Sequence, residues 1–202
     1  MDPTPLVLAG SVVRIEPLTE RHAPDLLTAA DDPNIWTYLP AYQPKSLGDM
    51  QAWISDALSC AAGGEQIPFA IVMLTNERAV GSTRFLEIRR DARALEIGWT
   101  WLATPVQRSA VNTECKLLLL RHAFEALGAL RVQFKTDRRN LRSQRAIERL
   151  GAVKEGTLRK HRINHDGFVR DSVYYSIVDD EWPTVKARLL QRLAQGELSG
   201  QR

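Results

Sequence analysis

Apolar residues follow two different periods along this chain of 202 residues. Segments in which apolar and polar residues alternate predict strands, and segments with apolar residues three and four positions apart predict helices. The predicted strands are residues 12–18, 69–74, 79–88, 94–102, 130–136, 152–162 and 168–178. The predicted helices are residues 20–30, 46–62, 107–127, 141–150 and 179–195.

The segments between these elements indicate how they connect. The turn signals Asn76-Glu77 and Arg90-Asp91 separate three successive strands, which is typical of an antiparallel meander. A helix lies between strands 94–102 and 130–136, so we expect these two strands to run parallel.

The element order therefore predicts an α+β (mixed α/β) fold, with a central, mostly antiparallel, twisted sheet of about seven strands flanked by helices. A break in the pattern that would divide the chain is absent from the sequence, so we expect one domain over residues 1–202. Its core is expected at about 12–180, and its C-terminal helix at 179–195.

Composition narrows the class of protein. Hydrophobic residues make up 44% of the chain and charged residues 25%, which suits a globular protein with a sizeable core. The longest apolar runs fall well short of the ~20 residues of a membrane helix, so we expect no membrane association. Cys60 and Cys115 lack the spacing of a disulfide framework or a zinc site, so we expect no metal and a cytoplasmic protein.

Positive charge is concentrated in residues 131–162, although the net charge is only +3. Such a stretch suits an anionic partner, and a polyphosphate cofactor satisfies it as well as RNA does. The weak overall charge does not demand a nucleic-acid partner, and we expect none that is DNA. An RNA- or ribosome-binding domain stays open as an alternative, and so does a homodimer.

The segment that joins strand 94–102 to the next helix is a candidate phosphate site. Small residues at a helix start expose backbone N–H groups, and the helix dipole favours an anion there. A plain turn capped by Ser109 or Thr113 is the alternative. The segment consists of Gln107, Arg108, Ser109, Ala110, Val111, Asn112 and Thr113.

A second candidate lies at the start of helix 141–150. Asn140 is a typical N-cap residue, and Gly151 is a typical C-terminal stop. Ser143 is one turn before Ile147, so its hydroxyl is expected on the buried side of the helix, toward the sheet. The alternative is a serine that hydrogen-bonds back to its own helix.

Together these features resemble the GCN5-related N-acetyltransferase (GNAT) superfamily, and within it the ribosomal-protein N-terminal acetyltransferase type (RimJ/RimL-like). The similarity extends from about residue 12 to 180. The segments that carry it are Leu95–Trp99, the phosphate loop 107–113 with helix 114–127, Asn140 to Gly151, and Arg170–Ile177. The resemblance implies a GNAT-like fold with a sheet splayed at the acetyl-CoA site.

The resemblance also implies an activity. Acetyl-CoA would donate an acetyl group to a primary amine, on a protein N-terminus or a small molecule, by direct attack in a ternary complex. Asn140 would face the cofactor arm, and Ser143 would protonate the leaving thiolate. The positions expected to bind the cofactor are Thr100, Trp101, Leu102, Gln107, Arg108, Ser109, Ala110, Val111, Asn112, Thr113, Asn140 and Ser143.

The chain departs from the family pattern at several positions. Ala110 and Asn112 replace two glycines of the phosphate loop. Ile147 stands where many members carry a tyrosine acid, and Arg162 stands where ribosomal-type relatives carry a glutamate base. These departures support an alternative of another class, a CoA-binding regulatory or interaction module with lost or weak turnover.

The attacking amine must be neutral, and amines have pKa values of about 8 to 10.4. A carboxylate or histidine that removes the proton through water is therefore needed. The candidates are Glu96 on a central strand, Asp137 at a strand end, and His161. Glu96 as a sheet-surface carboxylate and His161 as a solvated strand residue are the alternatives. Backbone N–H groups of residues 99–101 are candidates to bind the thioester carbonyl.

Aromatic residues follow the first predicted helix. Trp36, Tyr38 and Tyr42 are candidates to wall an acceptor pocket, and packing against the sheet is the alternative.

Overall fold

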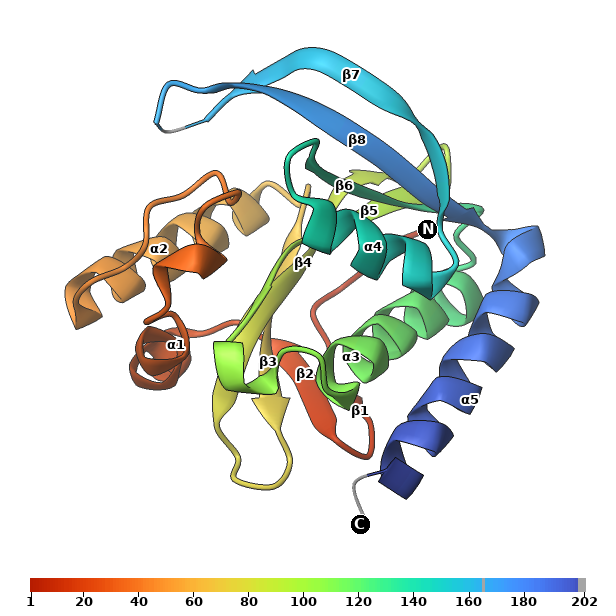
Figure 1. Cartoon of the computed structure of the whole chain (residues 1–202), viewed down its shortest axis with the longest axis horizontal. Helices are drawn as coiled ribbons and strands as arrows, with labels where there is room; N and C mark the ends of the chain where they lie inside the picture. Colours follow the sequence, from red (N-terminus) through yellow and green to blue (C-terminus); the bar gives the residue numbers. More distant parts are fainter. Residues whose placement is uncertain (165, 200–202) are drawn as a thin grey trace.

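The computed structural model describes residues 1–164 and 166–199, and side chains as far as residue 195. Within that part of the chain, one eight-stranded sheet has the order β1-β2-β3-β4-β5-β6-β8-β7 (Figure 1). The strands are β1 (Leu8–Ala9), β2 (Val13–Pro17), β3 (Ile67–Met73), β4 (Ala79–Arg89), β5 (Ala94–Leu102), β6 (Arg131–Asp137), β7 (Val153–Ile163) and β8 (Val169–Val178).

Helices cover both faces of the sheet (Figure 1). One core cluster joins α1 and α2 to β3 and β5, and a second joins α3, α4 and α5 to the opposite face. The helices are α1 (Ala23–Ala29), α2 (Leu47–Ala62), α3 (Ala110–Arg121), α4 (Leu141–Leu150) and α5 (Trp182–Ser199).

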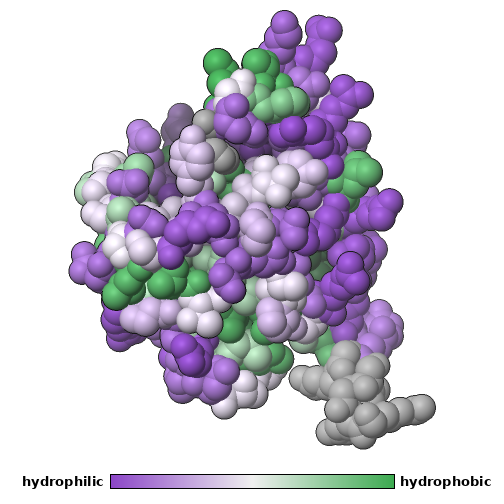
Figure 2. Space-filling view, turned by 60° about the vertical axis from the view of Figure 1, so that its left-hand side comes forward, coloured by the Kyte–Doolittle hydropathy of each residue, from purple (hydrophilic) through white to green (hydrophobic). Residues whose placement is uncertain are grey.

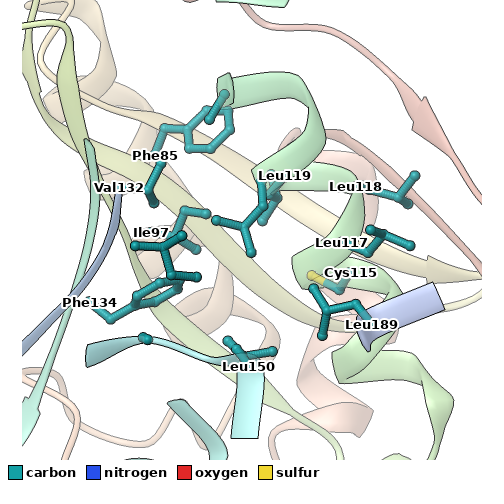
Figure 3. Close-up of a cluster of buried hydrophobic side chains, with 14 of the residues drawn as sticks. Phe85, Ile97, Cys115, Leu117, Leu118, Leu119, Val132, Phe134, Leu150 and Leu189 are labelled. Atoms are coloured by element: carbon teal, nitrogen blue, oxygen red, sulfur yellow. The ribbon is translucent and has the colours of Figure 1, made fainter. Parts of the chain in front are cut away.

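Helix α3 is buried almost all round because it lies between the sheet and α5. Its run of four leucines, 117–120, is buried in a cluster with residues from the sheet, α4 and α5. Figure 3 shows Leu117, Leu118 and Leu119 in this cluster. A helix that buries most of its sides is stable only in such an interior position. The position fixes the N-terminus of α3 against the end of β5.

The sheet divides between β5 and β6. In the described chain these parallel strands pair only through Ala94–Glu96 and Arg131–Gln133. Beyond that point β5 continues along β4 to Leu102, and β6 continues along β8 to Asp137. The C-terminal ends of the two strands therefore separate, as the expected parallel connection and splay require.

Strand β5 carries a bulge next to the splay. The register with β4 shifts between the pairs Ser82–Trp101 and Arg84–Gly98. Trp99 lies within the shift and has a φ of 51°, a left-handed conformation uncommon outside glycine. Bulges interrupt the ladder and re-aim neighbouring groups.

The fold agrees with the predicted one, with local differences. The strand 94–102 and the helix 141–150 have the predicted bounds. The short β1 strand was not predicted. The helix expected over 107–127 begins only at Ala110, after a 3-10 turn at Thr104–Val106, and ends in a π-helical turn at His122–Ala126. In the predicted turn after β7, His165 lies outside the described residues.

The surface is mostly polar. Hydrophilic side chains cover most of the face seen in Figure 2, and hydrophobic ones form separate small groups among them. In residues 1–164 and 166–199, no helix combines the length and the hydropathy needed to cross a membrane.

Candidate active site

The phosphate loop forms the entry to α3. Ser109 is the N-cap residue, and its hydroxyl accepts a hydrogen bond from the Val111 N–H at 3.3 Å and donates one to the Val106 carbonyl at 2.7 Å. Gln107 donates to the Leu102 carbonyl at 2.9 Å, which ties the loop to the end of β5. Arg108 has a φ of 63° and is exposed. The N–H groups of the first turn of α3 therefore point out of the end of the helix beside β5.

A cavity of about 790 Å³ lies between this loop, the start of α4 and the α1–α2 loop. Three arginines line it, whereas Asp32 is its one carboxylate among the described residues, so the cavity suits an anion. Its lining residues are Asp32, Asn34, Thr37, Tyr38, Thr104, Gln107, Arg108, Arg139, Asn140, Leu141 and Arg142. Arg142 also donates to the side chain of Gln107 at 3.0 Å and so links α4 to the phosphate loop.

Asn140 lines this cavity as the N-cap of α4, and Ser143 is the third residue of the helix. The Asn140 side chain caps the helix by accepting a hydrogen bond from the Ser143 N–H at 3.0 Å. Ser143 is half-buried on the side of Ile147, as expected. Its hydroxyl makes no hydrogen bond to another described residue, so it is available to a ligand.

Glu96 is buried beside β6. Its side chain is 3% exposed and accepts hydrogen bonds from Gln133 at 2.9 Å and from Lys135 at 3.1 Å. Burial raises the pKa of Glu96, and the charge of Lys135 opposes that rise. The Lys135 ammonium also pairs with Glu87 at 2.8 Å. Glu96 is therefore not a solvated surface carboxylate but a buried one with a pKa above its ordinary value.

His161 belongs to the same polar cluster. Its Nδ1 lies 3.0 Å from the Ser172 hydroxyl, and its Nε2 lies 3.3 Å from the Tyr174 hydroxyl. Lys135 Nζ lies 5.6 Å from the Tyr174 ring centre and so connects His161 to Glu96. Burial, followed by the nearby positive charges of Lys135, Arg162 and Arg170, lowers the pKa of His161. The His161 imidazole is therefore neutral at neutral pH and able to accept a proton.

Asp137 has a different environment. It is 1% exposed and receives hydrogen bonds from the Arg139 guanidinium at 2.8 and 3.1 Å. Burial acts to raise its pKa, but the hydrogen bonds and charge of Arg139 outweigh it and lower the pKa. Arg139 in turn stacks on Phe168 at 3.5 Å and lies 5.5 Å from the Tyr38 ring. Asp137 thus anchors an arginine that joins the α1–α2 loop to the β7–β8 turn.

The three aromatic residues expected to wall an acceptor pocket are separated. Tyr38 lines the cavity, and Tyr42 is 71% exposed. Trp36 is 4% exposed, and its ring packs against Trp53 and Trp101 with centroids 6.3 and 5.3 Å apart. Core packing, the alternative reading, therefore accounts for Trp36. The Trp101 side chain is also committed to this cluster, which leaves its backbone for the cofactor role expected of it.

Sequence patterns did not identify two buried cations near the β5 bulge. Lys116 interrupts the apolar run of α3, and Arg84 lies in an alternating strand, so each is typical of an exposed position by pattern alone. In the structure they are 5% and 4% exposed. A charged residue inside an otherwise apolar helix run was the available signal for Lys116.

A protein-family model for the acetyltransferase (GNAT) domain matches residues 13–153. The chain belongs to the GNAT acetyltransferase family. A solved protein from T. thermophilus, provisionally assigned as an acetyltransferase, is 42% identical to it; the match covers 96% of this chain and 100% of that one, with a TM-score of 0.85. YdaF of Bacillus subtilis (strain 168), provisionally named a ribosomal N-acetyltransferase, is 33% identical over 90 residues, 45% of this chain and 48% of YdaF.

One GNAT neighbour was solved with a coenzyme derivative. Mycobacterium smegmatis RimJ in complex with CoA-disulfide has a TM-score of 0.76 to this chain at 22% identity, with 94% of this chain and 93% of RimJ covered. At this identity the likeness concerns the fold. The chain spans 65% and 48% of the lengths of the two curated relatives it matches.

GNAT acetyltransferases use acetyl-CoA, and the residues present here fit that molecule. The helix start, the three arginines and the splayed end of β5 offer donors and positive charge for a diphosphate next to a gap between strands. Among the described residues, no group of three or more His, Cys, Asp or Glu side chains is arranged to hold a metal ion.

Proposed function

We propose that this chain transfers an acetyl group from acetyl-CoA to a primary amine by direct attack within a ternary complex. The observation that carries the proposal is the anionic-ligand cavity where the N-termini of α3 and α4 meet the divided sheet. Acetyl-CoA supplies the activated thioester. Every other role falls to side chains and backbone groups of this chain.

The cofactor roles follow from the arrangement of the loop. Residues 107–113 hold the diphosphate through the N–H groups of the first turn of α3, with Arg108 and Arg142 as counter-charges. Backbone groups of Thr100 to Leu102 bind the pantetheine arm along the unpaired edge of β5. Asn140 caps α4 beside that arm, and the unengaged Ser143 hydroxyl gives its proton to the departing thiolate.

The proton of the attacking amine passes to the polar cluster of Glu96 and His161. Glu96 has a raised pKa and is the first candidate, with a water molecule as relay. His161 is the second, because its lowered pKa keeps it neutral at neutral pH. Asp137 is the weakest of the three, because Arg139 stabilises its ionised form.

We further propose that the acceptor is the amino group of a protein N-terminus and that the reaction belongs to the ribosomal type. The names of YdaF and RimJ support this assignment, as does the concentration of positive charge in residues 131–162. Both cysteines lie in the described chain as free thiols, which supports a reducing, cytoplasmic setting.

A thiol-release assay with acetyl-CoA tests the proposal across a panel of N-terminal peptides, polyamines and small amines. The expected result is CoA release that depends on an amine and is strongest with N-terminal peptides. If a small-molecule amine is the best acceptor, the acetyltransferase proposal stands and the assignment to the ribosomal type is overturned. Binding of CoA with no release for any acceptor would overturn the enzyme and favour the regulatory CoA-binding module.

A further inference from the structure

Lys116 is a buried cation that lacks a carboxylate partner. It is 5% exposed, and none of the ion pairs formed by described residues includes it. Its Nζ donates to the Thr100 hydroxyl at 2.5 Å and to the Thr83 hydroxyl at 3.3 Å, and those two hydroxyl oxygens are 2.8 Å apart. Burial lowers its pKa. Nζ is a donor to Thr100 in the charged form and in the neutral form alike.

These hydroxyls lie at the β5 bulge. Thr83 and Thr100 both fall within the register shift between β4 and β5, and Thr100 directly follows the left-handed Trp99. The same part of β5 has no ladder to β6 in the described chain. Lys116 therefore contacts a stretch of β5 whose pairing with β4 is irregular. The same stretch does not pair with β6 in the described chain.

A second buried cation lies by the same bulge but has a different environment. The Arg84 guanidinium lies 4.2 Å from the Trp99 ring centre and 5.2 Å from that of Trp53. Arg84 is next to Thr83 along β4, so its side chain leaves the opposite face of the strand. Two indole faces compensate part of its charge, which gives Arg84 a packing role. The hydroxyls of Thr83 and Thr100 compensate the charge of Lys116 far less well than the indoles compensate that of Arg84.

We propose that Lys116 is a positioning residue for acetyl transfer, acting through Thr100 to hold the β5 bulge and to direct positive potential toward the thioester carbonyl. The inference rests on the proposed function. When the amine attacks, a C–N bond forms and negative charge develops on the carbonyl oxygen. The C–S bond then breaks, the amine proton passes to the base, and the thiolate takes a proton from Ser143, whose hydroxyl regains one from water. Positive potential beside the bulge stabilises the stage at which that oxygen is charged.

Lys116→Met tests this role, because methionine fills a similar volume without the donor. We expect kcat to fall by about 10- to 100-fold, somewhat less than the roughly 10²- to 10³-fold loss for a donor that contacts the oxyanion directly. The KM for acetyl-CoA should change by less than about threefold. The Tm should stay the same or rise, because an apolar side chain replaces an uncompensated buried charge.

The matched control is Ser82→Ala. Ser82 is a buried neighbour on β4 whose hydroxyl donates to the Phe69 carbonyl at 2.8 Å, on a contact separate from Lys116. It should retain the wild-type kcat. A purely structural lysine would give the reverse pattern for Lys116→Met, with a lower Tm and kcat within about twofold of wild type, and that pattern would overturn the inference.

A binding measurement separates this inference from the proposed function. Calorimetry compares acetyl-CoA with S-ethyl-CoA, a thioether that lacks the carbonyl. Wild type should bind acetyl-CoA more tightly, and Lys116→Met and Thr100→Val should each lose most of that preference, with no further loss in the double variant. If wild type binds neither ligand, the proposed function fails. If it prefers acetyl-CoA and Lys116→Met keeps the full preference, only the role of Lys116 fails.

Discussion

At the scale of single residues, the proposed chemistry depends on one free hydroxyl and on carboxylates that are held in place by partners. The Ser143 hydroxyl is unengaged within the described chain, whereas Asp137 and Glu96 are tied into ion pairs. A proton donor must be available to its ligand, and a buried carboxylate must be held by partners to remain ionised. The contrast separates the candidate acid from the candidate bases.

Ser143→Ala should lower kcat by about 10- to 100-fold and leave the acetyl-CoA affinity within about twofold, because the hydroxyl acts on the departing thiolate. Arg145→Ala, on the exposed side of the same helix, is the control and should match wild type. Steady-state kinetics with calorimetry of CoA binding provides both quantities. An unchanged kcat in Ser143→Ala would remove the acid role.

The pH dependence of kcat/KM identifies the base. A base must be deprotonated, so the rate falls as pH decreases through its pKa. The pKa of Glu96 is raised above 4.5 and that of His161 is lowered below 6.5, so Glu96 as the base predicts an acidic limb above pH 4.5 and His161 as the base predicts one below pH 6.5. Glu96→Gln should abolish the limb and slow the reaction, whereas His161→Gln should preserve it. The opposite result would assign the base to His161.

Ala110 is the first residue of α3, where the family resemblance implies a glycine. Ala110→Gly should tighten CoA binding a few-fold, since a bare backbone lets the diphosphate approach the N–H groups more closely. The loss of helix propensity is small at a first-turn position. Calorimetric titration with CoA measures the change, and an equal or weaker affinity would count against the loop as the diphosphate site.

At the scale of elements, one carboxylate joins the N-terminal turn to α3. Glu114 accepts hydrogen bonds from the backbone N–H groups of Ser11, Val12 and Val13 and from the Ser11 hydroxyl, at 2.7 to 2.8 Å. Gly10 permits this contact, because a Cβ there would lie 2.3 Å from the Glu114 carboxyl carbon. The β1–β2 turn and α3 are therefore held to each other.

Glu114→Gln should lower the free energy of unfolding at pH 7 by about 1–3 kcal/mol, because buried N–H donors lose a charged acceptor. Burial acts to raise the pKa of Glu114, but these hydrogen bonds outweigh it, and the pKa lies below the ordinary 4.5. The stabilisation is therefore full above pH 4.5 and lost as pH falls through the lower folded pKa. Urea unfolding at pH 7 and pH 3 should show the variant's deficit shrinking; an equal deficit at both would contradict this account.

Elements with a long, regular pattern could be predicted closely from the sequence. Strand 94–102 and helix 141–150 have clear periodicity and clear ends, and their bounds agree. The two-residue β1 has no period to detect, and the π-helical turn at His122–Ala126 depends on packing that the pattern of α3 does not contain. The helix predicted over 107–127 begins only at Ala110, because Ser109 has the extended conformation of an N-cap.

The residues of the candidate site also divide into those that local sequence predicts and those that depend on the fold. Asn140 and Ser143 are close in sequence, so the helix signals were sufficient to predict their place at the start of α4, whereas their roles and that of the phosphate loop stay predictions. Lys116 and Thr83 are 33 positions apart, and the Lys135–Glu96 pair depends on the β5–β6 register. Such contacts arise from the sheet topology, which the local pattern does not encode. Trp36 belongs to the core for the same reason, since Trp53 and Trp101 come from other elements.

At the scale of the whole molecule, the two cores are attached to different parts of the chain. Helices α1 and α2 pack on the N-terminal strands, and the turn after β7 reaches across through the Phe168–Arg139–Tyr38 stack. The cavity lies under this stack, beside the separated ends of β5 and β6. A ligand in that position contacts the α1–α2 loop, the entry to α3 and the start of α4.

The three residue pairs that join β5 to β6 have a mechanical consequence. They are the only rungs of the sheet, within the described chain, that connect strands β1–β5 to strands β6–β8, so bending of one half against the other concentrates there. A molecule lodged in the opening would act as a wedge that stiffens the joint. That stiffening would appear as slower amide hydrogen exchange at Leu95 and Val132 when CoA binds, although neither residue contacts the bound molecule.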